Sequence, residues 1–170
     1  MVIIGCGALG SIAATALTRA GVGKLKIIDR DFIEYHNLHR QILFNEDDIS
    51  NHLPKAIAAQ RRLKKINSSV EVEGVVSDVN VSNIEKLVQG ADMILDGLDN
   101  YETRFLINDV ALKHKIPWVY GGVISSYGMC MNIIPGKTPC FRCVYPKIPG
   151  SGRIFTCETA GLIKGSKLRK

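Results

Sequence analysis

The sequence predicts a doubly wound α/β fold with a mostly parallel sheet, one added antiparallel strand and a zinc-type loop near the C-terminus. Three observations carry this prediction. Apolar strand-like segments alternate with helical segments along most of the chain, a pattern typical of a parallel sheet. A glycine-rich turn joins the first strand to the first helix. The segment 127–134 follows a strand without an intervening helix, which favours an antiparallel pair because parallel strands need a long crossover.

The predicted elements follow one another in regular order. Strands are expected at 2–4, 24–29, 70–76, 92–96, 116–123 and 127–134, and helices at 8–20, 54–66, 83–90 and 102–115. The stretch 30–52 is expected to be irregular, with a short helical piece at 37–44. We expect a Rossmann-like domain over 1–134, a partial zinc or cysteine loop region over 135–163 and an atypical basic tail over 164–170.

Composition bounds the class of protein. The chain of 170 residues is long enough for one domain with a real core. It contains no run near the ~20 apolar residues that cross a bilayer and no signal peptide, so we expect a cytoplasmic protein that does not bind membranes. Of the net charge of +6, four positive residues fall in the last seven, and the basic run 61–65 falls on a predicted helix. A solvated helix face explains that run better than nucleic-acid binding.

The glycine-rich turn predicts a nucleotide site. Gly5, Gly7 and Gly10 form a G-x-G-x-x-G loop between strand and helix, where the helix N-terminus can bind phosphate. Asp29 follows Gly10 by 19 residues at the end of the next strand, and a carboxylate there can bind ribose hydroxyls. Because NAD and ATP both present an adenosine ribose and phosphates, this pattern alone is also typical of an NAD-dependent oxidoreductase.

Three further polar clusters favour ATP over NAD. The sequence places Asn37, Arg40 and Gln41 after the second strand, Lys55 at a helix start, and Asp96, Asp99, Asn100 and Arg104 after the fourth strand. Arginine and lysine can bind phosphate oxygens, and an acid can hold Mg²⁺. The alternatives are a polar surface loop, a solvated lysine, and helix capping by Asp99 or Asn100.

The five cysteines do not form a disulfide framework, because their number is odd and the chain is not small. Cys140 and Cys143 have the C-x-x-C spacing of half a tetrahedral zinc site, and a redox dithiol is the alternative. From chemistry alone, Cys157 is an ordinary semi-buried cysteine.

Taken in order, the segments "GCGALG", "AGVGKLKIIDRD", "NLHRQ", Pro54-Lys55, "DGLDNYETR", "PCFRC" and "TCETAG" resemble the ThiF/MoeB/HesA family. Its members are bacterial relatives of the ubiquitin-activating enzymes. The resemblance implies adenylation, with ATP and Mg²⁺, of the C-terminal glycine carboxylate of a small ubiquitin-like sulfur-carrier protein such as ThiS or MoaD. It also implies a homodimer and roles in thiamine or molybdopterin biosynthesis.

The resemblance assigns a role to each matching residue. Gly7, Ala8 and Gly10 would line the nucleotide, Asp29 would bind the ribose, and Asn37, Arg40, Gln41 and Lys55 would hold the phosphates. Asp99 would coordinate Mg²⁺ with Asn100 beside it, while Arg40 and Lys55 would stabilise the departing pyrophosphate. Cys140 and Cys143 would be two of four Zn²⁺ ligands, and Cys157 matches a cysteine that some relatives link covalently to the carrier.

The chain departs from the family pattern at both ends. The family's N-terminal segment, with an arginine that reaches the partner subunit's ATP site, is not found before Met1, and "KGSKLRK" replaces the expected apolar continuation. The sequence is therefore expected to be truncated, with an incomplete zinc site. An inactive fragment that retains nucleotide or carrier binding is the third hypothesis, beside the adenylating enzyme and the oxidoreductase.

Overall fold

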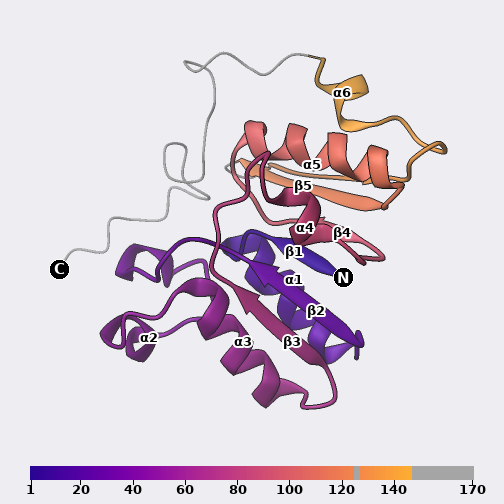
Figure 1. The fold of residues 1–170 in the computed structure, drawn as a ribbon. Helices are drawn as coiled ribbons and strands as arrows, with labels where there is room; N and C mark the ends of the chain where they lie inside the picture. Colours follow the sequence, from indigo (N-terminus) through magenta and orange to yellow (C-terminus); the bar gives the residue numbers. More distant parts are fainter. Residues whose placement is uncertain (125–126, 147–170) are drawn as a thin grey trace.

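A computed structural model describes residues 1–124 and 127–146. Its six-stranded sheet has the order β3-β2-β1-β4-β5-β6 (Figure 1). The strands are β1 (Val2–Ile4), β2 (Lys24–Ile28), β3 (Glu71–Val75), β4 (Ile94–Asp96), β5 (Trp118–Ile124) and β6 (Tyr127–Ile133). The pairs among β1 to β5 are parallel, and β6 runs antiparallel to β5. The predicted doubly wound sheet with an added antiparallel strand is confirmed.

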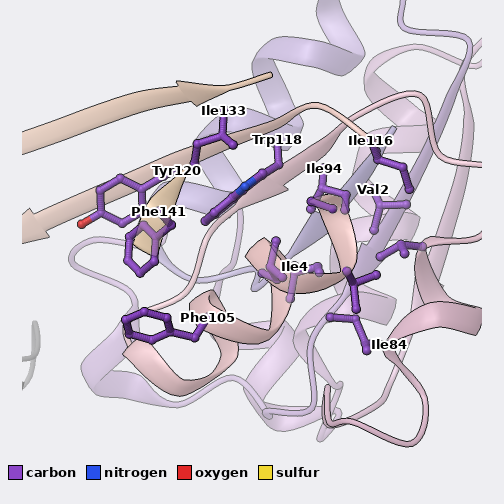
Figure 2. Close-up of a cluster of buried hydrophobic side chains, with 14 of the residues drawn as sticks. Val2, Ile4, Ile84, Ile94, Phe105, Ile116, Trp118, Tyr120, Ile133 and Phe141 are labelled. Carbon is purple, nitrogen blue, oxygen red and sulfur yellow. The ribbon is translucent and has the colours of Figure 1, made fainter. Parts of the chain in front are cut away.

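Helices cover both faces of the sheet. They are α1 (Ala8–Arg19), α2 (Glu46–Ser50), α3 (Lys55–Ile66), α4 (Ile84–Val88), α5 (Tyr101–His114) and α6 (Phe141–Val144), with a 3-10 helix η1 (Tyr35–Asn37). Successive side chains of a strand point to opposite faces, and β1 follows this rule. Ile3 joins a core with residues of α1 and α3, while Val2 and Ile4 join a second core with residues of α4 and α5 (Figure 2).

The expected basic face of the third helix is present. In the 61–65 run on α3, Arg61, Lys64 and Lys65 are exposed while Leu63 is buried. Arg62 pairs with Asp48 of α2 at 2.7 Å, so this run is a solvated helix face. Within the described residues, no helix is long and apolar enough to cross a membrane.

The connection between β2 and α3 differs from its prediction. The helical piece expected at 37–44 is wrong: η1 ends at Asn37, and turns follow. The Asn37 side chain accepts the Glu34 backbone N–H, and Leu43 and Phe44 are buried in the core, so local bonds and burial override helix propensity. The sequence analysis also missed α2, whose Asn45 and Asp48 form a reciprocal capping box.

A backbone contact between three glycines joins the turns after β1 and β4. Gly5 has a φ of +91°, a region that favours glycine. A Cβ atom on Gly10 would lie 1.9 Å from the Gly5 carbonyl oxygen, and one on Gly97 would lie 2.3 Å from the same atom. Helix α1 and the loop after β4 therefore approach the first turn more closely than any side chain permits.

Gly97→Ala is expected to lower the free energy of unfolding by about 2 kcal/mol or more, because the added methyl group meets fixed backbone rather than a flexible side chain. Urea denaturation measures this change. Gly23→Ala is the matched control, since a Cβ there meets no atom within 4 Å. Equal stabilities of the two variants would contradict the proposed close contact.

Candidate active site

A cavity of about 960 Å³ opens at the carboxyl ends of the parallel strands. Strand order reverses between β1 and β4, and in open α/β sheets ligands bind outside the strand ends at such a switch point. Its volume lies at the upper end of the about 300–1,000 Å³ typical of small-molecule sites. The predicted nucleotide residues that line it are Gly7, Ala8, Asp29, Asn37, Arg40, Gln41, Lys55, Asp99 and Asn100.

Asp29 is tied to the glycine loop. Its Oδ2 accepts the Cys6 backbone N–H at 2.6 Å, and its Oδ1 accepts the Asp31 N–H at 2.8 Å. Burial raises the pKa of Asp29 above its usual range, while these two hydrogen bonds and nearby Lys55 oppose the shift. A carboxylate has about four lone-pair sites, so two acceptor positions stay available for hydroxyl groups.

Lys55, at the first position of α3, lies against the loop after β2. Its backbone N–H donates to the Asp31 carbonyl oxygen at 2.9 Å, and its Nζ pairs with the Asp31 carboxylate at 3.0 Å. The side chain is only 8% exposed, whereas that of Asp31 is 54% exposed. The Asp31 carboxylate thus supplies an anionic partner for this lysine within the protein, a pairing that was not predicted from the sequence.

The segment after η1 brings an arginine and a glutamine to the cavity wall. Arg40 is half-buried and donates to the His36 carbonyl oxygen at 2.7 Å; no described carboxylate lies within ion-pair distance of it. Gln41 is 3% exposed, and its Oε1 has no hydrogen-bond partner. A buried acceptor without a partner costs about 1–3 kcal/mol, so this oxygen fits a site that is completed by a ligand group donating a hydrogen bond.

The N-terminus of α1 faces this cavity. Gly7 is its N-cap, no side chain caps it, and its first turn holds no acidic residue. Gly7 and Ala8 line the cavity, so free N–H groups and the positive end of the helix dipole are available to an anion. Gly10 does not line the cavity; its contact with Gly5 gives it a packing position behind the loop.

The four polar residues predicted around the loop between β4 and α5 have different roles in the structure. Asp96 and Arg104 form a buried ion pair at 2.8 Å. Burial raises the pKa of Asp96 to about 6, against the opposing charge of Arg104. Asn100 caps α5 by accepting the Thr103 N–H at 2.9 Å. Asp99 is exposed and lines the cavity, so its carboxylate is available to a ligand.

Sequence analysis missed part of the cavity wall. The loop 77–81 after β3 lines it, as do Tyr127 and Met129 of β6. The loop could have been found from its position, because β3 is parallel to β2 and ends at the same edge of the sheet. The start of β6 could have been found in the same way, since an antiparallel strand begins at the edge where its neighbour β5 ends.

Cys140 and Cys143 lie away from the cavity, at the start of α6. Their Sγ atoms are 3.5 Å apart, close to the about 3.8 Å between two sulfurs on one tetrahedral Zn²⁺. Burial opposes ionisation of Cys140, but hydrogen bonds from Cys143 and the Arg142 backbone outweigh it and lower the pKa of Cys140. The described residues contain no group of three or more His, Cys, Asp or Glu side chains placed to hold a metal, and Cys157 lies outside them.

Contacts with α5 and β5 anchor α6. Phe141 is fully buried among the rings of Phe105, Trp118 and Tyr120 (Figure 2), at centroid distances of 5.0–5.7 Å. Its backbone N–H donates to buried Asn108 at 2.8 Å. The C-x-x-C segment is therefore anchored on α5 by an aromatic cluster.

The sequence of this chain is similar to the sequences of known adenylyltransferases and activating enzymes. The sulfur carrier protein ThiS adenylyltransferase of Bacillus subtilis is 49% identical over 168 residues, covering 99% of this chain and 49% of the relative. The SAMP-activating enzyme E1 of Haloferax volcanii is 37% identical, covering 96% of this chain and 59% of the relative. The chain thus spans about half the length of the curated relatives it matches.

A solved structure also resembles this chain in its fold. The crystal structure of E. coli MccB with ATP matches with a TM-score of 0.77 and 30% identity, over 85% of this chain and 44% of that one. The profile of the ThiF family matches residues 1–166. Together with the glycine loop and the polar residues at the switch point, this match shows that the chain belongs to the ThiF family.

Proposed function

We propose that this chain carries the ATP-binding site of an enzyme that adenylates the C-terminal glycine carboxylate of a small ubiquitin-like sulfur-carrier protein. The observation that carries the proposal is the cavity at the switch point. It gathers a ribose-type acid, Asp29, two cations, Arg40 and Lys55, and an accessible acid, Asp99. The names of the ThiS adenylyltransferase and the SAMP-activating enzyme support the same reaction class.

The reaction needs positive charge to stabilise the leaving group, but it needs no base to activate the nucleophile. A carboxylate oxygen of the carrier attacks the α-phosphorus of ATP, the bond from that phosphorus to the bridging oxygen breaks, and pyrophosphate departs with the electron pair. A C-terminal carboxylate is already ionised at pH 7, so no proton has to be removed. Arg40 and Lys55 would stabilise the negative charge that develops on the leaving group.

Lys55 would change partners when a nucleotide binds. In the structure its ammonium group pairs with Asp31, whose largely exposed carboxylate can return to water. A phosphate oxygen can replace that carboxylate, because both are anionic acceptors of charge-assisted hydrogen bonds. The ion pair thus holds the lysine in a buried position before the substrate arrives.

ATP would use more of the polar side chains in the cavity wall than NAD would. Asp29 and the α1 N-terminus suit the ribose and phosphates of either nucleotide. Arg40 and Lys55 add cationic donors beyond the glycine loop, and a triphosphate uses them. This favours the adenylating enzyme over the oxidoreductase.

Two separate sets of residues would bind metal ions. Asp99 would hold Mg²⁺, as an accessible carboxylate suits a hard cation shared with phosphates, and Asn100 lies beside it. Bound Mg²⁺ would neutralise phosphate charge. Cys140 and Cys143 would supply two Zn²⁺ ligands, and the other two must come from outside the described residues.

Three other expectations stay predictions. The homodimer and the covalent link through Cys157 come from the resemblance, and the cytoplasmic location comes from composition. Four described cysteines are free thiols, which suits a reducing compartment.

The direct test is exchange of labelled pyrophosphate into ATP by the chain in the presence of a ThiS-like carrier that ends in Gly-Gly. We expect exchange that requires the carrier. A carrier lacking its last glycine is the control and should give none. Nucleotide binding without exchange would favour the inactive fragment, and NADH binding that ATP with Mg²⁺ cannot displace would favour the oxidoreductase.

Arg40→Ala is expected to slow carrier-dependent exchange by on the order of 100-fold or more, because a preorganised donor to the leaving group is lost. Exchange kinetics measure the effect. The matched control is Arg19→Ala, an exposed arginine in the last turn of α1. A similar rate in both variants would exclude Arg40 from phosphate binding.

Asp99→Asn is expected to raise the Mg²⁺ concentration for half-maximal exchange by about 10-fold or more, because a neutral amide is a weaker ligand for a hard cation. Titration of Mg²⁺ at fixed ATP measures it. Asp92→Asn, an exposed acid just before β4, serves as the control. An unchanged Mg²⁺ requirement in Asp99→Asn would rule out the assigned metal ligand.

A further inference from the structure

Arg104 holds a central position under the cavity floor. It lies in the first turns of α5, its side chain is 6% exposed, and it borders the cavity. Its Nε donates to the Asp96 carboxylate at 2.8 Å. Its Nη2 donates to the carbonyl oxygens of Leu98 and Gly121, the latter at 2.9 Å. One guanidinium group therefore joins the end of β4, the loop after it and the middle of β5.

The same network fixes both polar groups of Leu98. The Leu98 N–H donates to the Asp96 Oδ1 at 2.7 Å, and its carbonyl oxygen accepts from Arg104. The Leu98 carbonyl belongs to the peptide bond that leads into Asp99. On the other side of Asp99, the Asn100 side chain caps α5. Asp99 thus sits between two anchored residues, and its own carboxylate is exposed at the cavity.

An arginine suits this position in a way that a lysine does not. The planar guanidinium presents several N–H donors in a fixed fork, and here it reaches three acceptors. Its carbon Cζ lies 4.9 Å from the centroid of the Tyr120 ring and 5.7 Å from that of Tyr101. A lysine keeps the charge but offers one flexible donor group, so it cannot hold all three acceptors in this geometry.

Stability alone is a poor reason for this ion pair. Replacing a buried pair with apolar side chains is often neutral or stabilising, because two charges must be removed from water. The bonds of Arg104 do define the path of the loop that carries Asp99. A precise loop path matters where a metal ligand must be held, and residues behind the ligands of a metal site affect its affinity strongly.

We propose that Arg104 is a positioning residue for Asp99: by holding the carbonyl oxygen of Leu98 against β5, it sets the direction in which Asp99 meets Mg²⁺ on the nucleotide. This inference rests on the proposed function through the Mg²⁺ role of Asp99. It assigns Arg104 no contact with the reacting atoms.

The test measures nucleotide affinity directly. Calorimetry gives the dissociation constant of a non-hydrolysable ATP analogue with the chain, over a range of Mg²⁺ concentrations and without Mg²⁺. For Arg104→Lys, we expect the Mg²⁺ concentration at half-maximal gain in affinity to rise about 10-fold or more, with Mg²⁺-free affinity changed by less than about 2-fold. A role in stability alone would lower the melting temperature and leave this concentration unchanged.

Arg62→Lys is the matched control. Arg62 also donates through Nε and Nη2 to one carboxylate, that of nearly buried Asp48, but it does not border the cavity. We expect its Mg²⁺ dependence to equal that of the wild type. Equal Mg²⁺ dependence in Arg104→Lys and Arg62→Lys would overturn the proposal.

Asp96→Asn keeps the test decisive if Arg104→Lys does not fold. It preserves the shape and an acceptor for the Leu98 N–H, but it weakens the anchor of Arg104. We expect a smaller rise in the same direction, and no rise would overturn the proposal. If the wild type gains affinity with Mg²⁺ but shows no carrier-dependent exchange, the proposed function fails while the calorimetry still decides the role of Arg104.

Discussion

The close approach of Gly5, Gly10 and Gly97 is the constraint on which the site depends. The carbonyl oxygen of Gly5 occupies the space that a Cβ atom on either of the other two glycines would need. Helix α1 and the loop after β4 can therefore meet at the first turn. This contact brings the N-terminus of α1 and Asp99 to one cavity, although about ninety residues separate them in the sequence. The contact sets where both halves of the site lie.

A second set of bonds places charge around that frame. Asp29 binds the glycine loop through the Cys6 N–H, and Asp31 holds Lys55 through both its backbone and its carboxylate. Burying a cation without a partner costs free energy. The pairing with Asp31 offsets this cost and keeps Lys55 at the cavity wall before a nucleotide binds. The protein thus carries an internal anion where the proposed substrate would bring its phosphates.

The sequence predicted most of the fold because its signals are local. The alternation of strands and helices and the glycine loop can each be recognised from a few neighbouring residues. Among the site residues, Asp29 and Arg40 could be placed near the cavity, since they follow a strand whose end faces it. The pairing of Lys55 with Asp31 and the three acceptors of Arg104 could not, because they join segments that only tertiary packing brings together. Helix α2 was missed although its capping box is visible in the sequence.

A crystal structure of the chain with a non-hydrolysable ATP analogue and Mg²⁺ tests the central claim most directly. We expect the ribose hydroxyls to lie within hydrogen-bond distance of Asp29, with the phosphates between the α1 N-terminus, Arg40 and Lys55. We also expect Lys55 to have exchanged the Asp31 carboxylate for a phosphate oxygen. An analogue bound elsewhere, or bound with its phosphates away from Arg40 and Lys55, would contradict it.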